Sequence, residues 1–153
     1  MDRQKYILKR FENILLSFGY KDPFLYRDGD NFIAAIFQMN EETENFYAVQ
    51  LGWCIDTETE KIIFRAERVW DTIADENEEA FLHFCNSWNN KSFYGTALYN
   101  KELYLDHTLP LPDRISDMYL IIHVYRKLAF AAERFFEEAQ KEFNWIPKPD
   151  VNL

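Results

Sequence analysis

Three histidines and two cysteines are the side chains of this sequence best suited to metal binding or acid-base catalysis. His83 and Cys85 stand two positions apart in a segment of helical periodicity, so their side chains point to different faces and lack zinc-like spacing. His107 follows Asp106 in a predicted strand, where adjacent side chains point to opposite faces, so a surface turn is favoured over an acid-base pair. His123 lies among aliphatic residues and is expected to be an interfacial or hydrogen-bonded histidine. We therefore expect no metal and no cofactor.

The remaining candidates for chemistry are serines, glycines and one acidic run. No serine lies in a Gly-x-Ser-x-Gly turn, and four glycines leave no phosphate-binding loop. The run from Glu41 to Glu44 lacks the alternating ligands and the turn glycine of a calcium loop, and a solvated turn is expected there. The sequence therefore predicts a protein that is not an enzyme.

Aromatic residues are the more informative feature, with 14 Phe, 9 Tyr and 4 Trp. These are too many to bury completely beside the aliphatic core, and Tyr and Trp suit surfaces that are apolar on one side and wet on the other. We predict that one face or edge of a sheet, bearing Tyr47, Trp53 and Trp70, accepts a partner polypeptide as an added strand or an apolar plug.

Length and charge limit the class of protein. A chain of 153 residues is the usual size of one domain. The net charge of −9 opposes binding to nucleic acid, which depends on Lys and Arg neutralising phosphates. The sequence contains no apolar run of the ~18 residues that a membrane helix needs. Cys54 and Cys85 are expected to be free thiols, which indicates a cytoplasmic protein.

Hydrophobic periodicity predicts the elements that must position these residues. The expected elements are a helix at about Asp2–Phe18, strands at Phe24–Tyr26, Phe32–Met39, Asn45–Asp56 and Ile62–Trp70, a helix from about Asp75 to Trp88, strands at Ser92–Tyr99 and Glu102–His107, and a helix at Ser116–Phe143. The order α-β-β-β-β-α-β-β-α predicts the α+β class, an antiparallel sheet with helices packed on it. Residues 1–144 are expected to form one domain and residues 145–153 a C-terminal tail.

The first half of the last predicted helix is apolar almost all round. A helix without a polar face is buried or meets another chain. We predict a homodimer contact at Tyr119, Leu120 and Val124; the alternative is a helix sunk between the sheet and neighbouring helices.

A family resemblance lies mainly in the second half of the chain. The Asn-Ser-Trp-Asn run from Asn86 to Asn89, Phe93 at the start of a strand, a hairpin through Asn100 and the Leu-Pro-Leu-Pro segment from Leu109 resemble the YbjN family. The long final helix and the front half also fit. Asn86 and Asn89 are expected to end the helix and hold the following loop rather than bind a ligand.

The resemblance implies a fold and a general role. YbjN proteins are described as bacterial sensory transduction regulators with a fold similar to type III secretion chaperones. Those chaperones bind partner polypeptides as dimers. They have no established catalysis. This chain departs from the family where Pro112, Asp113 and Arg114 replace a common pair of glycines, which affects a loop.

Three functional hypotheses follow from the residues and the resemblance. The first is a chaperone-like or regulatory module that binds a polypeptide. The second is an immunity protein that neutralises a toxin, since an acidic surface steers association with a basic partner. The third, an enzyme of unknown class, has no catalytic set behind it.

Overall fold

The computed structural model describes residues 6, 9–10, 13, 24–27, 32–40, 42, 44, 46–56, 58–74, 78–91, 94–110 and 118–149. For residues 24–27, 32–37, 55 and 118–121 it describes the backbone. The elements are β1 (Phe24–Arg27), β2 (Phe32–Met39), β3 (Tyr47–Asp56), β4 (Lys61–Arg68), β5 (Asp71–Ile73), α2 (Glu78–Lys91), β6 (Thr96–Asn100), β7 (Glu102–Pro110), α3 (Met118–Glu142) and β8 (Trp145–Pro147).

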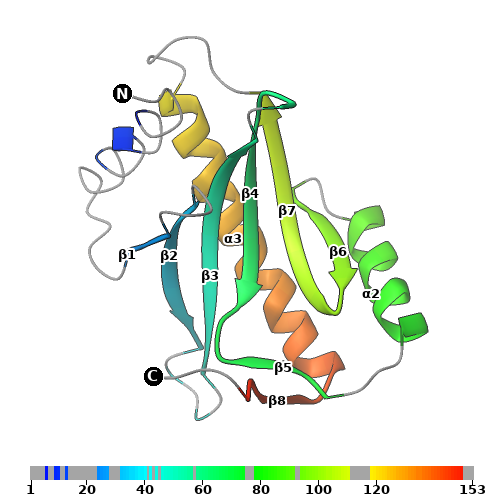
Figure 1. Cartoon of the computed structure of the whole chain (residues 1–153). Coiled ribbons are helices and arrows are strands. Elements are labelled where there is room, and N and C mark those ends of the chain that lie inside the picture. Colours follow the sequence, from blue (N-terminus) through cyan, green and yellow to red (C-terminus); the bar gives the residue numbers. More distant parts are fainter. Residues whose placement is uncertain are drawn as a thin grey trace.

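Six strands form an antiparallel sheet in the order β1-β2-β3-β4-β7-β6 (Figure 1). The predicted α+β class and element order are confirmed. Of the first predicted helix the structure describes four helical positions, 6, 9, 10 and 13, and the rest lies outside the described residues. The predicted hairpin at Asn100 is also confirmed: Asn100 pairs with Glu102, and Lys101 between them has a φ of 63°.

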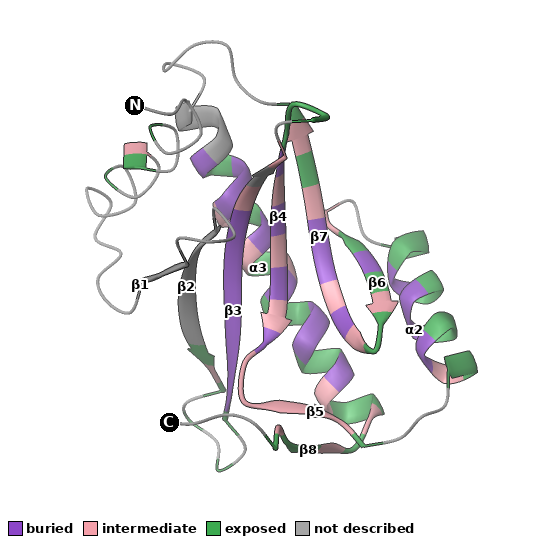
Figure 2. Cartoon of the chain, viewed as in Figure 1, coloured by how far each residue is buried: buried purple, intermediate pink, exposed green. Residues whose placement is uncertain are grey.

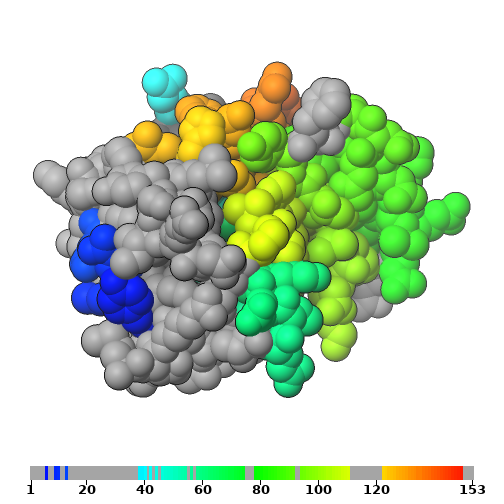
Figure 3. All heavy atoms as spheres, turned by 90° about the horizontal axis from the view of Figure 1, so that it is seen from above, coloured from blue at the N-terminus to red at the C-terminus, as the bar shows by residue number. Residues whose placement is uncertain are grey.

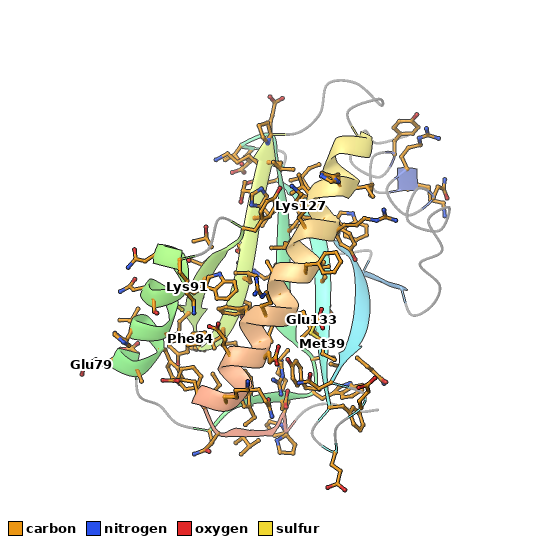
Figure 4. The ribbon with its side chains drawn as sticks, turned by 180° about the vertical axis from the view of Figure 1, so that it is seen from behind. Met39, Glu79, Phe84, Lys91, Lys127 and Glu133 are labelled. Atoms are coloured by element: carbon orange, nitrogen blue, oxygen red, sulfur yellow. The ribbon has the colours of Figure 1, made fainter. Side chains whose placement is uncertain are left out.

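Helix α3 crosses one face of the sheet and supplies more of the buried core residues than any other described element (Figures 1 and 4). On β4 the buried side chains alternate with half-buried ones, as a strand covered on one face requires. Tyr125 of α3 packs edge-on against Trp53 of β3 at 5.3 Å and contacts Phe64 of β4 at 6.2 Å, measured between ring centroids. Figure 2 shows β3 buried over most of its length.

Helix α2 packs beside the edge strand β6 (Figure 1). Its predicted apolar stripe is confirmed, because Phe81, Phe84, Cys85 and Trp88 are buried. Phe84 and Trp88 both pack on Phe135 of α3, at 5.3 and 5.1 Å between ring centroids. The two helices are therefore joined by one aromatic cluster.

Two short strands were not predicted. β5 and β8 pair antiparallel, with Ile73 opposite Trp145, at the lower end of the sheet in Figure 1. Backbone hydrogen bonds from Ala74 N to Asn144 O and from Lys148 N to Trp70 O, both 2.8 Å, extend this ladder. The predicted tail at residues 145–153 is therefore wrong for its first part, which belongs to the fold.

Several predicted strand boundaries also change. β4 ends at Arg68 rather than at Trp70, and β7 continues past His107 to Pro110. β6 begins at Thr96 and not at the predicted Ser92, which lies outside the described residues; Gly95, directly before β6, has a φ of 77°, which is not a strand conformation. A Cβ at Gly95 would lie 2.7 Å from the Leu105 side chain, so this position requires glycine for space as well as for conformation. Within the described residues, no helix is both long and apolar enough to cross a membrane.

Candidate functional site

The predicted partner-binding aromatics do not share an accessible surface. Tyr47 and Trp53 are 2% and 0% exposed, because the face of β3 that carries its large side chains is the face that α3 covers. The prediction that Tyr47 and Trp53 lie on an open surface is therefore wrong. Trp70 is half-buried and meets exposed Phe46 edge-on, 6.4 Å between ring centroids.

The predicted dimer residues lie in the first two turns of α3. Val124 is 9% exposed in the single chain, so for this residue the alternative of burial within one chain holds. The side chains of Tyr119 and Leu120 lie outside the described residues. A homodimer therefore stays a prediction.

Asn89 closes part of the sheet edge. Its side-chain Oδ1 accepts a hydrogen bond from Ala97 N at 2.7 Å, and its Nδ2 donates to Ala97 O at 3.2 Å. The amide thus satisfies both outward backbone groups of a residue in the edge strand β6, as a neighbouring strand would. Asn86 is exposed, and Phe93 lies outside the described residues. Helix α2 continues past both asparagines to Lys91, so the prediction that they end the helix is wrong, whereas the expectation that Asn89 holds the chain that follows is consistent with these contacts.

Arg68 is a buried charge that the sequence did not reveal. Its guanidinium donates to Asp71, with Nε 2.8 Å from Oδ1 and Nη2 bonded to Oδ2, and Nη1 donates to Gln140 Oε1 at 2.7 Å. The Tyr47 and Trp145 rings lie against it, 4.0 and 3.9 Å from Cζ to each centroid. Burial raises the pKa of Tyr47 to about 12. This cluster, which we call the Arg68 clamp, fixes β8 against the sheet.

A groove of about 580 Å³ lies between α2 and α3. Its lining residues are Trp88, Lys91, Tyr94, Lys127, Phe130, Ala131, Arg134 and Glu138. The five from α3 recur at helical spacing and so form one stripe along that helix. Phe130 is 73% exposed at this groove. We call this feature the α2–α3 groove.

The groove carries more positive than negative side chains. Lys91 Nζ lies 2.8 Å from Glu138 Oε2 and joins α2 to α3 across it. Lys127 Nζ lies 5.2 Å from the Tyr94 ring centroid, and Arg134 is exposed. Figure 4 shows Lys91 and Lys127 on the side of α3 that faces α2, with Glu133 on the other side. In Figure 3 the green segment of the chain, which includes α2, reaches the surface beside the orange part of α3.

The candidate catalytic side chains are dispersed. Asp106 binds Arg65 bidentately, at 2.9 and 2.8 Å, whereas His107 on the opposite face stacks on Tyr94 at 5.6 Å. Burial lowers the pKa of His107 and raises the pKa of Cys85 to about 11. In the part of the chain that the structure describes, no group of three His, Cys, Asp or Glu residues is placed to hold a metal ion.

Sequence reasoning missed the groove, although part of its signal was present. Phe130 stands between Lys127 and Arg134 on the otherwise polar side of α3. An aromatic residue flanked by cations on an outer helix face could have marked it. The contribution of Trp88 and Lys91 could not, because it depends on how α2 packs against α3.

Comparisons with known proteins support the fold. No family model and no curated protein sequence matches this chain, so membership of the YbjN family stays a prediction. A chain in the crystal structure of the ExsC-ExsE complex is similar, with a TM-score of 0.50 and 13% identity, over 88% of this chain and 94% of that chain. At this identity the similarity shows a shared fold, and it supports the chaperone-like fold that the resemblance implies.

Proposed function

We propose that this protein is a non-catalytic, chaperone-like module that binds a partner polypeptide. The observation that carries the proposal is the α2–α3 groove, with an aromatic side chain exposed beside it. Aromatic and Arg side chains are enriched where proteins bind one another, and Phe130 and Arg134 provide both. The shared fold with a chain solved in a two-protein complex adds support.

The dimensions of the groove suit a polypeptide segment. From Lys127 to Glu138 the lining stripe covers eleven residue-to-residue steps of helix, or about 16 Å. An extended chain advances about 3.3 Å per residue, so roughly five residues would lie along the stripe. Strand addition at β6 is less suited, because Asn89 already occupies the backbone groups of Ala97.

Selection from a random peptide library displayed on phage tests this function even when the partner is unidentified. We expect enrichment of peptides on the immobilised protein, and loss of that enrichment on a Phe130→Ala variant. Leu82→Ala is the matched control, since Leu82 is exposed on α2 and does not line the groove. Enrichment equal on all three proteins, or none on the wild type, would refute the proposal.

We also propose a homodimer through Tyr119 and Leu120 in a cytoplasmic protein. The support is the apolar sequence at the start of α3. Light scattering after size exclusion tests it, with the expectation of twice the chain mass for the wild type and of the single-chain mass for a Leu120→Glu variant. A monomeric wild type at micromolar concentration would remove the dimer from the proposal.

A further inference from the structure

We propose that the α2–α3 groove selects an acidic partner segment in which one aromatic or aliphatic side chain lies between two carboxylates. This inference rests on the proposed function and specifies the chemistry of its partner.

The charge of the groove is opposite to that of the whole chain. Among the described residues its lining holds three cations and one carboxylate, and Glu138 is already paired with Lys91. Lys127 lies near the Tyr94 ring rather than a described carboxylate, and Arg134 is exposed, so both can meet an occupant. The chain as a whole carries −9, yet at physiological salt charges more than ~8 Å apart are largely screened. The two local cations therefore dominate the attraction of a bound segment.

The spacing of these cations suits an extended segment. Lys127 and Arg134 are seven residues apart on α3, about 10.5 Å along the axis, with Phe130 between them. In an extended chain, side chains at positions i, i+2 and i+4 share a face, and the outer two are about 13 Å apart. The Lys and Arg side chains are long and flexible enough to bridge the difference between about 10.5 Å along the helix and about 13 Å along the segment. An acid-x-apolar-x-acid pattern thus places its carboxylates at the cations and its apolar side chain at Phe130.

The apolar residues at the groove favour a peptide over a nucleic acid. Trp88 and Ala131 line it beside Phe130, which offers contact area to an aliphatic or aromatic side chain. Nucleic-acid affinity rises with the number of phosphates that cations neutralise, and Lys127 and Arg134 at this groove can neutralise few of them.

Defined peptides test the inference. The probe is a fluorescein-labelled peptide with the centre Glu-Ser-Phe-Ser-Glu; one comparison peptide has Lys in place of both Glu residues, and another has Ser in place of Phe. In fluorescence anisotropy at ~0.15 M salt we expect the Lys peptide and the Ser peptide each to bind at least roughly tenfold more weakly than the probe.

Charge reversal in the groove supplies the site test. Lys127→Glu and Arg134→Glu should each weaken binding of the acidic probe roughly tenfold and improve binding of the Lys peptide. Lys141→Glu, the same change at an exposed position of α3 outside the groove, should leave both affinities unchanged. Equal effects of all three variants would overturn the site. Circular dichroism confirms that each variant is folded.

The other outcomes separate the inference from the function on which it rests. Peptides enriched on phage without acidic residues, or insensitive to Arg134→Glu, would overturn the inference and leave polypeptide binding in place. No enrichment and no binding by any peptide would reject both. Displacement of the acidic probe by an oligo(dT) competitor would indicate a nucleic-acid site, and a dimer that Arg134→Glu dissociates would indicate a second copy of this chain; either would overturn the inference.

Discussion

Replacement of Arg68 by methionine should destabilise the protein more than any surface charge change. The Arg68 side chain is 3% exposed and is held by Asp71, Gln140 and two aromatic rings. Methionine keeps much of the aliphatic contact but removes the charge. Asp71, whose side chain is 23% exposed, then loses its ion-pair partner in a largely buried place.

The expected loss is about 3 kcal/mol in the free energy of unfolding. Removing one partner of a buried ion pair costs roughly 3–5 kcal/mol, and the partial exposure of Asp71 places this case at the lower end. For a domain of this length, that loss corresponds to a decrease of about 6–12 °C in melting temperature. Arg68→Lys keeps the charge but loses the bidentate contact and the planar stacking, so an intermediate loss is expected.

Urea unfolding followed by tryptophan fluorescence and circular dichroism measures these losses. Arg134→Met is the matched control, because Arg134 is exposed on α3 and its loss should cost no more than about 0.5 kcal/mol. Arg68→Met combined with Asp71→Asn should be less destabilised than the sum of the single variants, since neither charge is then left alone. A folded Arg68→Met protein within about 1 kcal/mol of wild type would contradict the assignment of the clamp as a stabilising ion pair.

Three further predictions concern the edge strand, pH and thiol reactivity. Asn89→Ala should lower the free energy of unfolding by about 1–3 kcal/mol and promote self-association, because both outward backbone groups of Ala97 lose their partner. Melting temperature measures the first effect and light scattering the second, and Asn86→Ala is the control that should show neither. Burial lowers the pKa of His107 in the folded protein, so the unfolded chain binds the proton more readily. The contribution of neutral, buried His107 to the free energy of unfolding is therefore complete above its ordinary pKa of 6.5 and declines as pH falls below that value. Urea titrations of His107→Phe should lack this decline. Cys85, with its pKa raised to about 11, should resist alkylation at pH 8 until the chain unfolds. Rapid labelling at Cys85 in the native protein, located by mass spectrometry, would contradict its burial.

The long helix could be predicted because its buried residues repeat at helical spacing. Tyr125, Leu128 and Phe135 belong to that pattern and are buried as expected. The same reasoning failed for Tyr47 and Trp53, since alternation along β3 shows which side chains share a face but not which face another element covers. Sequence periodicity thus defines faces, and tertiary packing decides which of them meets solvent.

Arg68 shows a second feature that local sequence patterns do not predict, which is the burial of a charged side chain. A charged residue after Glu67 indicates the exposed end of a strand, and nothing local in the sequence places it in the core. Its burial depends on Gln140 and Trp145, which are more than seventy residues away along the chain. Side chains that are buried through distant partners cannot be recognised from the pattern around them, and the short strands β5 and β8 were missed for the same reason.

The two sides of α3 separate the fold from the proposed partner chemistry. Phe135 faces the core, and Trp88 both packs on it and lines the groove, so a change at Trp88 would alter folding and binding together. Lys127 and Arg134 are exposed at the groove, so their charge can change with little effect on the core. Proteins that share this fold at low identity therefore need not share a partner. If the proposal is correct, the charge that flanks Phe130, rather than the fold, decides which segment the groove accepts.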